Sequence, residues 1–312
     1  MEIYDWKYLE EQEPTAVALG FFDGVHLGHK ALIDGMLKIS KEKNLKSCVV
    51  TFKQHPLTRV FPKYAPKLIT SNEEKIRILE QFDIDMLVFI DFTEEIMGME
   101  PEEFIEKILH EKLNAKGIVV GFNYNFGKKG SGNPEILEHL KNKYDYCVSV
   151  VKPVTIKDGQ IVSSTLIRNL IVNGKVDQIE KYLGRKFSVF GKVIRGKGLG
   201  RQFDIPTANI KIAENHILPD AGVYYTTIIV DGEKYHGLTN VGYNPTFENH
   251  PFSIETYIYN FGTDIYGETV ELIFNKKIRK EKKFDTLDEL IDQIKTDISN
   301  TYEKYVLKVK KQ

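Results

Sequence analysis

The chain has 312 residues, of which 42% are apolar and 28% charged, a balance typical of globular proteins and a length that allows two domains. Its formal net charge is −1, with 43 basic and 44 acidic residues. That balance disfavours nucleic acid as a main partner, because nucleic-acid binders usually carry a marked basic excess. No signal peptide is recognisable, and no apolar run approaches the ~20 residues of a membrane span. We therefore expect a cytoplasmic protein without a membrane partner; no sequence signal bears on its oligomeric state.

The first half of the chain alternates strand-like and helix-like segments. Short apolar runs predict five strands, at 16–22, 48–52, 86–91, 117–121 and 147–151. Apolar periodicity and capping residues predict the helices between them, at 29–44, 71–82, 101–114 and 134–143. Strands that recur between helices predict an α/β doubly wound, Rossmann-like sheet, in which ligands bind beyond the carboxyl ends of the strands.

After Gly184 the pattern changes to consecutive short strands separated by turn residues. These strands are predicted at 187–194, 224–230, 234–239, 254–259 and 269–274. One long helix follows, with Thr286 and Glu289 as its cap and an apolar stripe that runs to Tyr302. The pattern indicates an antiparallel sheet or small β-barrel with a C-terminal helix laid against it. We therefore expect two domains, 1–184 and 185–312.

The loop at 20–29, GFFDGVHLGH, lies between the first predicted strand and the first predicted helix. A helix N-terminus presents unpaired N–H groups and a partial positive charge, which suits phosphate. Gly20 and Gly28 remove side chains where the backbone must approach a polyphosphate. His26 and His29 can donate hydrogen bonds to a phosphorus centre under attack. A solvent-exposed turn with two histidines is the alternative, but the position directly after the first strand favours nucleotide binding.

Two later segments of the first half strengthen this interpretation. The segment 121–127, GFNYNFG, follows the fourth strand, and 162–168, VSSTLIR, precedes a further helix. Ser164 and Thr165 offer hydroxyl groups at the start of that helix, and Arg168 offers a guanidinium group for phosphate oxygens. Ser164 is equally well explained as an N-cap residue.

A glycine-rich stretch and the sequence PTAN open the second half. The glycines suggest a loop that closes over phosphates, although an ordinary hairpin connection explains them equally well; they include Gly191, Gly196 and Gly198. Thr207 and Asn209 lie on the same side of an extended segment. Their neutral oxygen atoms suit Mg²⁺ that is shared with ATP.

Glu255 lies in the alternating sequence SIETYIY, on the face that also carries Tyr257 and Tyr259. A strand glutamate usually faces solvent. Phosphoryl transfer to an alcohol, however, needs a carboxylate base near the hydroxyl group, so Glu255 is a candidate for that base.

The motifs of the first half resemble those of a known family. HxGH with a downstream SSTxIR resembles the nucleotidylyltransferase superfamily. The fuller GFFDGVHLGH, with FxxHP at 52–56, resembles the FMN adenylyltransferase module of bacterial bifunctional riboflavin kinase/FAD synthetases. The resemblance implies that His26 and His29 engage the ATP phosphates. It further implies nucleotide contacts from Gly20, Phe21, Asp23, Gly28, Asn123, Ser164, Thr165 and Arg168, and a flavin contact from Asn125.

The motifs of the second half resemble the riboflavin kinase module of the same family, a six-stranded antiparallel barrel with a C-terminal helix. By this resemblance Thr207 and Asn209 bind Mg-ATP, and Glu255 activates the ribityl 5′-hydroxyl group. The glycine-rich stretch with Gly191, Gly196 and Gly198 would contact nucleotide. The segment 240–247, NVGYNPTF, would contact the flavin through Asn240, Pro245 and Thr246.

The sequence departs from the family pattern at two places. Asn123-Tyr124 stands where many members have Asp-Phe, and Phe203-Asp204 stands where Leu-Gly is usual. We expect both to alter affinity or rate rather than to abolish a reaction.

The resemblance implies a bifunctional, Mg²⁺-dependent transferase that converts riboflavin to FMN and FMN to FAD, with ATP as co-substrate. One alternative is an enzyme in which only one domain is active. The other is a non-catalytic protein that senses flavin or ATP. The presence of both catalytic sets argues against the second alternative; these are His26, His29 and Arg168 in the first half and Thr207, Asn209 and Glu255 in the second.

Overall fold

The structure is a computed structural model that describes residues 1–196, 200, 203–242 and 252–307. Within it the chain divides into two compact units, Met1–Ser164 and Thr165–Gln312. Each unit has its own sheet.

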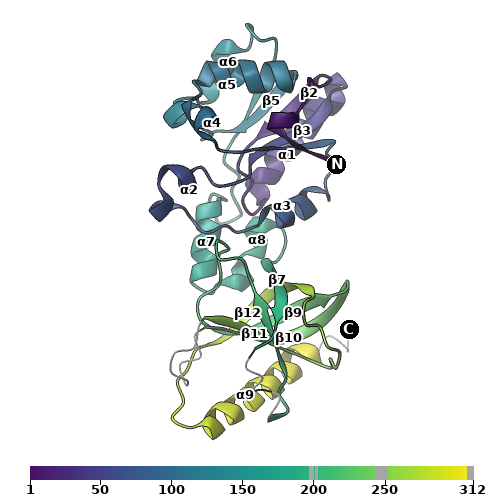
Figure 1. The fold of residues 1–312 in the computed structure, drawn as a ribbon, viewed down its shortest axis with the longest axis vertical. Coiled ribbons are helices and arrows are strands. Elements are labelled where there is room, and N and C mark those ends of the chain that lie inside the picture. Colours follow the sequence, from purple (N-terminus) through teal and green to yellow (C-terminus); the bar gives the residue numbers. More distant parts are fainter. Residues whose placement is uncertain (197–199, 201–202, 243–251, 308–312) are drawn as a thin grey trace. The chain divides into compact units, whose positions relative to one another are not determined.

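The first unit is built on a six-stranded parallel sheet with the strand order β1-β4-β3-β2-β5-β6. Its strands β2, β3 and β5 are labelled in Figure 1. The strands are β1 (Glu2–Asp5), β2 (Thr15–Leu19), β3 (Lys46–Phe52), β4 (Met86–Ile90), β5 (Ala115–Gly121) and β6 (Cys147–Val151). Five of them occupy predicted segments. Strand β1 was not predicted, because this edge strand has only four residues and no buried side chain.

Helices connect these strands and cover the sheet. They are α1 (Leu27–Lys43), α2 (Leu57–Val60), α3 (Asn72–Leu79), α4 (Glu94–Gly98), α5 (Pro101–Phe104), η3 (Ile105–Lys112) and α6 (Pro134–Leu140). The predicted capping box of α3 is present: Glu74 N–H donates to Ser71 Oγ at 3.1 Å, and Ser71 N–H donates to Glu74 Oε2 at 2.6 Å. The predicted helix 101–114 forms as α5 followed by η3, which has π-helical geometry.

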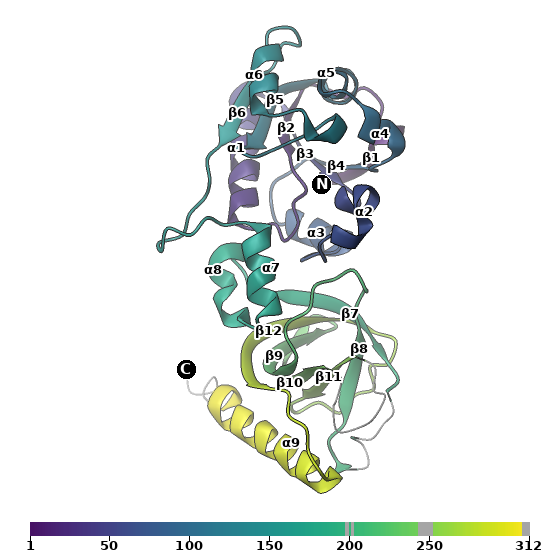
Figure 2. The same cartoon turned by 90° about the vertical axis from the view of Figure 1, so that its left-hand side faces the viewer.

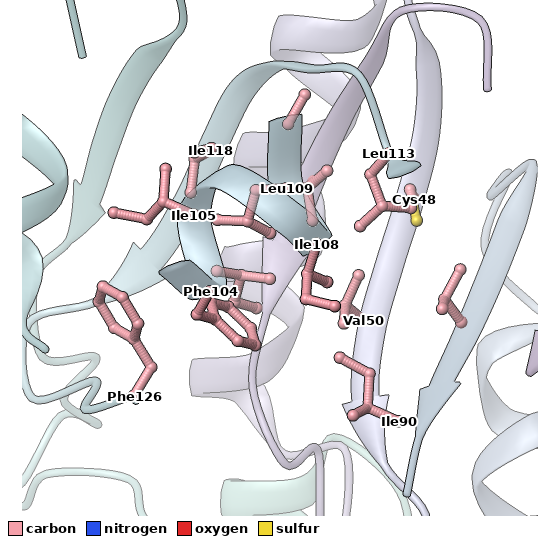
Figure 3. Packing of buried hydrophobic residues seen from close by; sticks show 14 of the residues in the cluster. Cys48, Val50, Ile90, Phe104, Ile105, Ile108, Leu109, Leu113, Ile118 and Phe126 are labelled. Atoms are coloured by element: carbon pink, nitrogen blue, oxygen red, sulfur yellow. The ribbon is translucent and has the colours of Figure 1, made fainter. Parts of the chain in front are cut away.

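Apolar side chains are buried on both faces of the sheet, as the near-continuous apolar runs of parallel strands require. On one face Phe104, Ile105, Ile108 and Leu109 pack onto strand residues such as Val50 (Figure 3). On the other face residues of α1, including Ile33 and Met36, pack on the alternate strand side chains. Each fully buried large side chain contributes about 1.5–3 kcal/mol of transfer free energy, so this double core fixes the strand ends that carry the loops.

The second unit contains a closed antiparallel barrel with the strand order β10-β11-β8-β7-β12-β9 (Figure 2). Its strands are β7 (Ser188–Ile194), β8 (Thr207–Lys211), β9 (Gly222–Val230), β10 (Glu233–Gly242), β11 (Ser253–Ile258) and β12 (Thr269–Lys280). Helix α9 (Leu287–Thr301) follows, and Glu289 N–H donates to Thr286 Oγ1 at its start. The predicted doubly wound α/β domain, followed by an antiparallel barrel with a C-terminal helix, is confirmed.

Three buried hydroxyl groups form a chain inside the barrel. Thr226 Oγ1 and Thr239 Oγ1 are 2.8 Å apart, and Thr239 Oγ1 and Thr256 Oγ1 are 2.9 Å apart. All three residues are fully buried. Because Ile254, Thr256 and Ile258 are the buried residues of β11, the alternate residues Glu255 and Tyr257 point outward.

A short helical segment joins the barrel in the second unit. It comprises α7 (Ser164–Val172), η5 (Val176–Gln178) and α8 (Glu180–Leu183). Gly174, which ends α7 with φ +67°, lies so close to the barrel that a Cβ there would stand 3.0 Å from Tyr224 Oη. The compact units thus divide after Ser164, the first residue of this segment, whereas the domain boundary expected from the sequence lies after the segment, at Gly184.

Across the described part of the chain, the helices are too short or too polar for any of them to traverse a lipid bilayer.

Candidate functional site

The loop after β2 leaves the first sheet where the strand order reverses. Strand β2 pairs with β3 on one side and with β5 on the other. The chain runs outward from β2 through β3 to β4, and then returns to the other side of β2 as β5 and β6. Such a switch point opens a crevice at the carboxyl ends of parallel strands, where open α/β sheets bind ligands. The structure therefore places the loop at 20–29 at the edge where open α/β sheets of this kind bind ligands.

The two histidines meet at the N-terminus of α1. His26 Nδ1 accepts a hydrogen bond from His29 N–H at 3.2 Å and caps the helix. Their rings stack with centroids 3.7 Å apart and an interplanar angle of 10°. A Cβ at Gly28 would stand 3.0 Å from His26 Cε1, so glycine permits the stack. Since Nδ1 of His26 accepts, the neutral ring carries its proton on Nε2 and can donate from there.

The backbone of this loop is strained at buried positions. Phe22 has φ +52° and Val25 has φ +39°, and both are fully buried. Residues other than glycine rarely adopt a positive φ, so the surrounding contacts must hold Phe22 and Val25 in this conformation. Asp23, 1% exposed, accepts hydrogen bonds from Ile69 N–H at 2.9 Å and Thr70 N–H at 3.0 Å. The Asp23 carboxylate thus ties the loop to the backbone at Ile69 and Thr70. From the sequence it was grouped with the nucleotide-binding residues.

Ser164 joins the same loop from far along the chain. Its hydroxyl donates to the Asp23 carbonyl at 3.0 Å, and it is the first residue of α7. Thr165 and Arg168 follow on the first turns of this helix and are grouped with the second unit. Of the three residues predicted to hold phosphate, Ser164 contacts the loop directly.

Asn123 and Asn125 lie on the loop that follows β5, the neighbour of β2 in the sheet. Both are exposed, and Asn125 Nδ2 donates to the Asn123 carbonyl at 3.3 Å. Phe122, in the same loop, is 49% exposed. This loop therefore offers amide groups and an aromatic ring at the strand edge where the His26–His29 loop begins.

A second set of polar side chains forms a row across three strands of the barrel. In the strand register, Asn209 of β8 is opposite Glu255 of β11, which in turn is opposite Asn240 of β10. Thr207 is opposite Tyr257 in the same pairing. Directly opposed residues of antiparallel strands share a face, so the row lies on the outer surface of the barrel. The alternation in SIETYIY predicted the face of Glu255 correctly. The register that aligns Asn209, Glu255 and Asn240 depends on strand pairing in the folded barrel, which the local sequence does not encode.

The row borders a pocket between the barrel and α9. The pocket has a volume of about 110 Å³. Its polar wall includes Thr207, Asn240 and Glu255, and its apolar wall includes Leu238, Phe284, Leu290 and Ile294. A second pocket of about 600 Å³ also has Thr207 and Tyr257 in its lining. Thr207 therefore lines both pockets.

The predicted glycines of the barrel fall into different environments. Gly191 is buried within β7, where a Cβ would overlap Ile210, so the absence of a side chain there serves barrel packing. A Cβ at Gly196 would overlap the Asn209 amide, so Gly196 lets the chain approach the polar row. Asp204 adopts φ +58°, a conformation that the usual glycine accepts freely and aspartate tolerates. Gly198, Pro245 and Thr246 lie outside the described residues.

One ion pair of the pocket was missed by the sequence analysis. Arg279 Nε and Nη2 donate to Asp297 Oδ2 at 2.8 and 2.7 Å, and Asp297 is 6% exposed. The pair joins β12 to α9, and both residues line the pocket beside Glu255. The available signal was Asp297 itself, a charged residue one helical turn after Ile294 on the apolar face of α9.

The chain resembles proteins of known family along most of its length. The sequence profile of FAD synthetases matches residues 8–166, and that of riboflavin kinases matches residues 183–305. The bifunctional riboflavin kinase/FMN adenylyltransferase of Bacillus subtilis (strain 168) is 37% identical over 292 residues, which cover 92% of either chain. The protein of that name from Escherichia coli (strain K12) is 31% identical over 287 residues, 92% of this chain and 91% of the relative.

A solved structure agrees in fold. A protein from Streptococcus pneumoniae, described as a macrolide-efflux protein, superposes with a TM-score of 0.86 at 32% identity, covering 98% of this chain and 100% of that one. The two profiles and the two relatives agree with one another. The chain belongs to the family of bifunctional riboflavin kinase/FMN adenylyltransferases.

Proposed function

We propose that this chain makes FAD from riboflavin in two transfers, one in each domain. The barrel domain, 185–312, phosphorylates riboflavin with ATP to give FMN and ADP. The α/β domain, 1–184, joins FMN to the adenylyl group of a second ATP. The observation that carries the proposal is the presence of two separate polar sites in one family member, the histidine-capped helix at the switch point and the Glu255 row between two pockets.

In the adenylyl transfer, a phosphate oxygen of FMN attacks the α-phosphorus of ATP. A new P–O bond joins the two phosphates, and the bond to the β-phosphate breaks, which releases pyrophosphate. His26 and His29 donate hydrogen bonds to the phosphate oxygens. The unpaired N–H groups at the start of α1 add the partial positive charge of the helix N-terminus. Ser164, Thr165 and Arg168 hold the triphosphate. Asn123 and Asn125 contact the nucleotide and the flavin from the β5 loop.

In the kinase reaction, Glu255 accepts the proton of the ribityl 5′-hydroxyl group while the oxygen attacks the γ-phosphorus. The apolar wall of the smaller pocket suits the flavin ring, and Asn240 lies beside it. The γ-phosphoryl group leaves ADP and passes to the alcohol, which makes FMN.

The side-chain oxygens of Thr207 and Asn209 fit a hard cation, because they are neutral oxygen ligands on one strand face beside Gly196. Mg²⁺ bound there would neutralise the phosphate charge of ATP during transfer. Among the described residues no group of three His, Cys, Asp or Glu side chains offers a metal cage; the proposed site relies on the nucleotide for its remaining ligands. We place both reactions in the cytoplasm, with riboflavin, FMN and ATP as the partners.

Incubation of the full chain with riboflavin, ATP and Mg²⁺, followed by chromatography of the flavins, tests the proposal. We expect FAD to accumulate after a transient rise of FMN. FMN as the only product would show that the adenylyltransferase domain is inactive. Unchanged riboflavin would contradict the kinase assignment, and added FMN would then show whether the other reaction proceeds.

The Arg279–Asp297 pair gives a prediction for the flavin pocket. Asp297→Ala removes the carboxylate partner of the half-buried Arg279 guanidinium, which should lower the free energy of unfolding of the barrel by about 1–3 kcal/mol. Because α9 forms one wall of the pocket, the KM for riboflavin should also rise. Denaturant unfolding and kinase kinetics measure the two effects. Asp292→Ala, at an exposed position of the same helix, is the matched control and should change neither.

A further inference from the structure

A lysine lies buried behind the loop that carries the two histidines. Lys75 belongs to α3, labelled in Figure 1, and is 1% exposed. Its ammonium group donates hydrogen bonds to the Phe21 carbonyl at 2.9 Å and to Thr51 Oγ1 at 3.2 Å. Thr51 Oγ1 in turn donates to the same carbonyl at 2.9 Å. The Phe21 carbonyl therefore accepts two hydrogen bonds, one of them from a buried cation.

These contacts act at the point where the loop backbone is strained. The Lys75 ammonium lies 4.6 Å from the centroid of the Phe21 ring and 5.9 Å from that of Phe89, within the range of cation–π attraction. The peptide group that it holds is the one that joins Phe21 to Phe22, the first left-handed residue of the loop. Asp23 holds the following turn through Ile69 and Thr70. The buried side chains of Lys75 and Asp23, of opposite charge, thus both hold the backbone of the loop in place.

The charge of Lys75 does not favour the folded state. Burial lowers the pKa of the Lys75 ammonium to about 8, against a smaller opposing effect of Asp23. A lowered pKa means that the folded protein disfavours the charged form relative to water. At neutral pH the ammonium is still the main form, so the fold carries this cost. An apolar side chain of similar length would fill the same space without it.

We propose that Lys75 is a positioning residue for adenylyl transfer. It holds the Phe21 carbonyl and, through it, the turn at Phe22, so that His26 and His29 are presented to the phosphates of ATP. The proposal rests on the function proposed for this loop. It assigns to α3 a part in the reaction, although α3 itself does not touch substrate.

The test is Lys75→Met in the full chain, with FMN and ATP as substrates. The kcat of FAD formation should fall by up to ~10²-fold, because displacement of reacting groups by about 1 Å costs that much. The KM for FMN and the rate of riboflavin phosphorylation should stay unchanged. The Tm should stay the same or rise, since the buried charge is gone. A merely structural residue would lower activity and Tm together.

Two further variants complete the experiment. Lys38→Met removes a lysine of α1 whose side chain is 75% exposed, and it should change neither activity nor Tm. Thr51→Val removes the hydroxyl group but keeps the charge, and it should lower kcat by a smaller factor. It decides the question if Lys75→Met does not fold.

If the wild-type protein makes FAD and both Lys75→Met and Thr51→Val leave kcat unchanged, the role of Lys75 is overturned while the function proposed for the loop stands. A decrease in kcat that follows a decrease in Tm would overturn it too. A wild-type protein that makes no FAD from FMN would instead overturn the function proposed for the loop, and the role of Lys75 with it.

Discussion

Replacement of His29 by alanine is expected to lower the rate of FAD formation by ~10²–10³, the usual cost of losing one donor to a charged transition state. His29 lies on the first turn of α1, stacked on His26, and we propose that it donates to oxygens around the attacked phosphorus. The helix and its cap remain, because the His26 Nδ1 bond uses the backbone N–H of residue 29. FMN formation should therefore be intact. Separate assays with FMN and with riboflavin as substrate measure the two rates.

The control for His29→Ala is His139→Ala, an exposed histidine on α6 of the same unit. It should leave both rates as in the wild type. If His29→Ala formed FAD at the wild-type rate, the histidine pair would have no part in the chemistry. If it reduced FMN formation to the same degree, the assignment of the two reactions to separate domains would be wrong.

Glu255→Gln should have the converse effect. A glutamine keeps the shape of the side chain and its place opposite Asn209 and Asn240, but it cannot accept the proton of an alcohol. General bases contribute typically ~10²–10⁴-fold, so the kinase rate should fall by that factor while FMN adenylylation continues. Because shape and register are kept, the KM for riboflavin should change little.

Glu233→Gln is the matched control, an exposed glutamate at the start of β10 in the same barrel. Product formation from riboflavin, followed by chromatography, compares the two variants. A Glu255→Gln protein that phosphorylates riboflavin normally would remove the carboxylate from the mechanism. The row of polar side chains would then serve binding only.

Local sequence patterns predicted most of the elements, because their signals are contained within a few residues. The alternation of strands and helices in the first half and the capping box at Ser71 are of this kind. Strand β1 was not predicted because a short edge strand whose side chains are all at least partly exposed has no periodic apolar pattern. The sequence left open whether the second half forms an open sheet or a barrel. Closure depends on the pairing of β10 with β9 and β11 at once, which no local pattern encodes.

The candidate sites divide in the same way. The loop with His26 and His29 could be predicted, because its function depends on a helix that begins within the motif. The part played by Asp23 could not, since it depends on Ile69 and Thr70 of a distant segment. Lys75 likewise reaches the loop only through the packing of α3. Its sequence signal was a charged residue four positions before the buried Leu79, on the face that α3 turns inward.

Closure of the barrel has a consequence for Glu255. A strand at the edge of an open sheet can slip by one residue against a single neighbour, and such a slip turns every side chain to the opposite face. Strand β11 is held by β10 on one side and by β8 on the other. Slippage there would bury Glu255 among the threonine hydroxyls of the interior and would have to propagate around the whole ring. Substitutions that weaken the barrel away from the pocket should therefore lose kinase activity by unfolding outright, and the folded fraction that remains should turn over at the full rate.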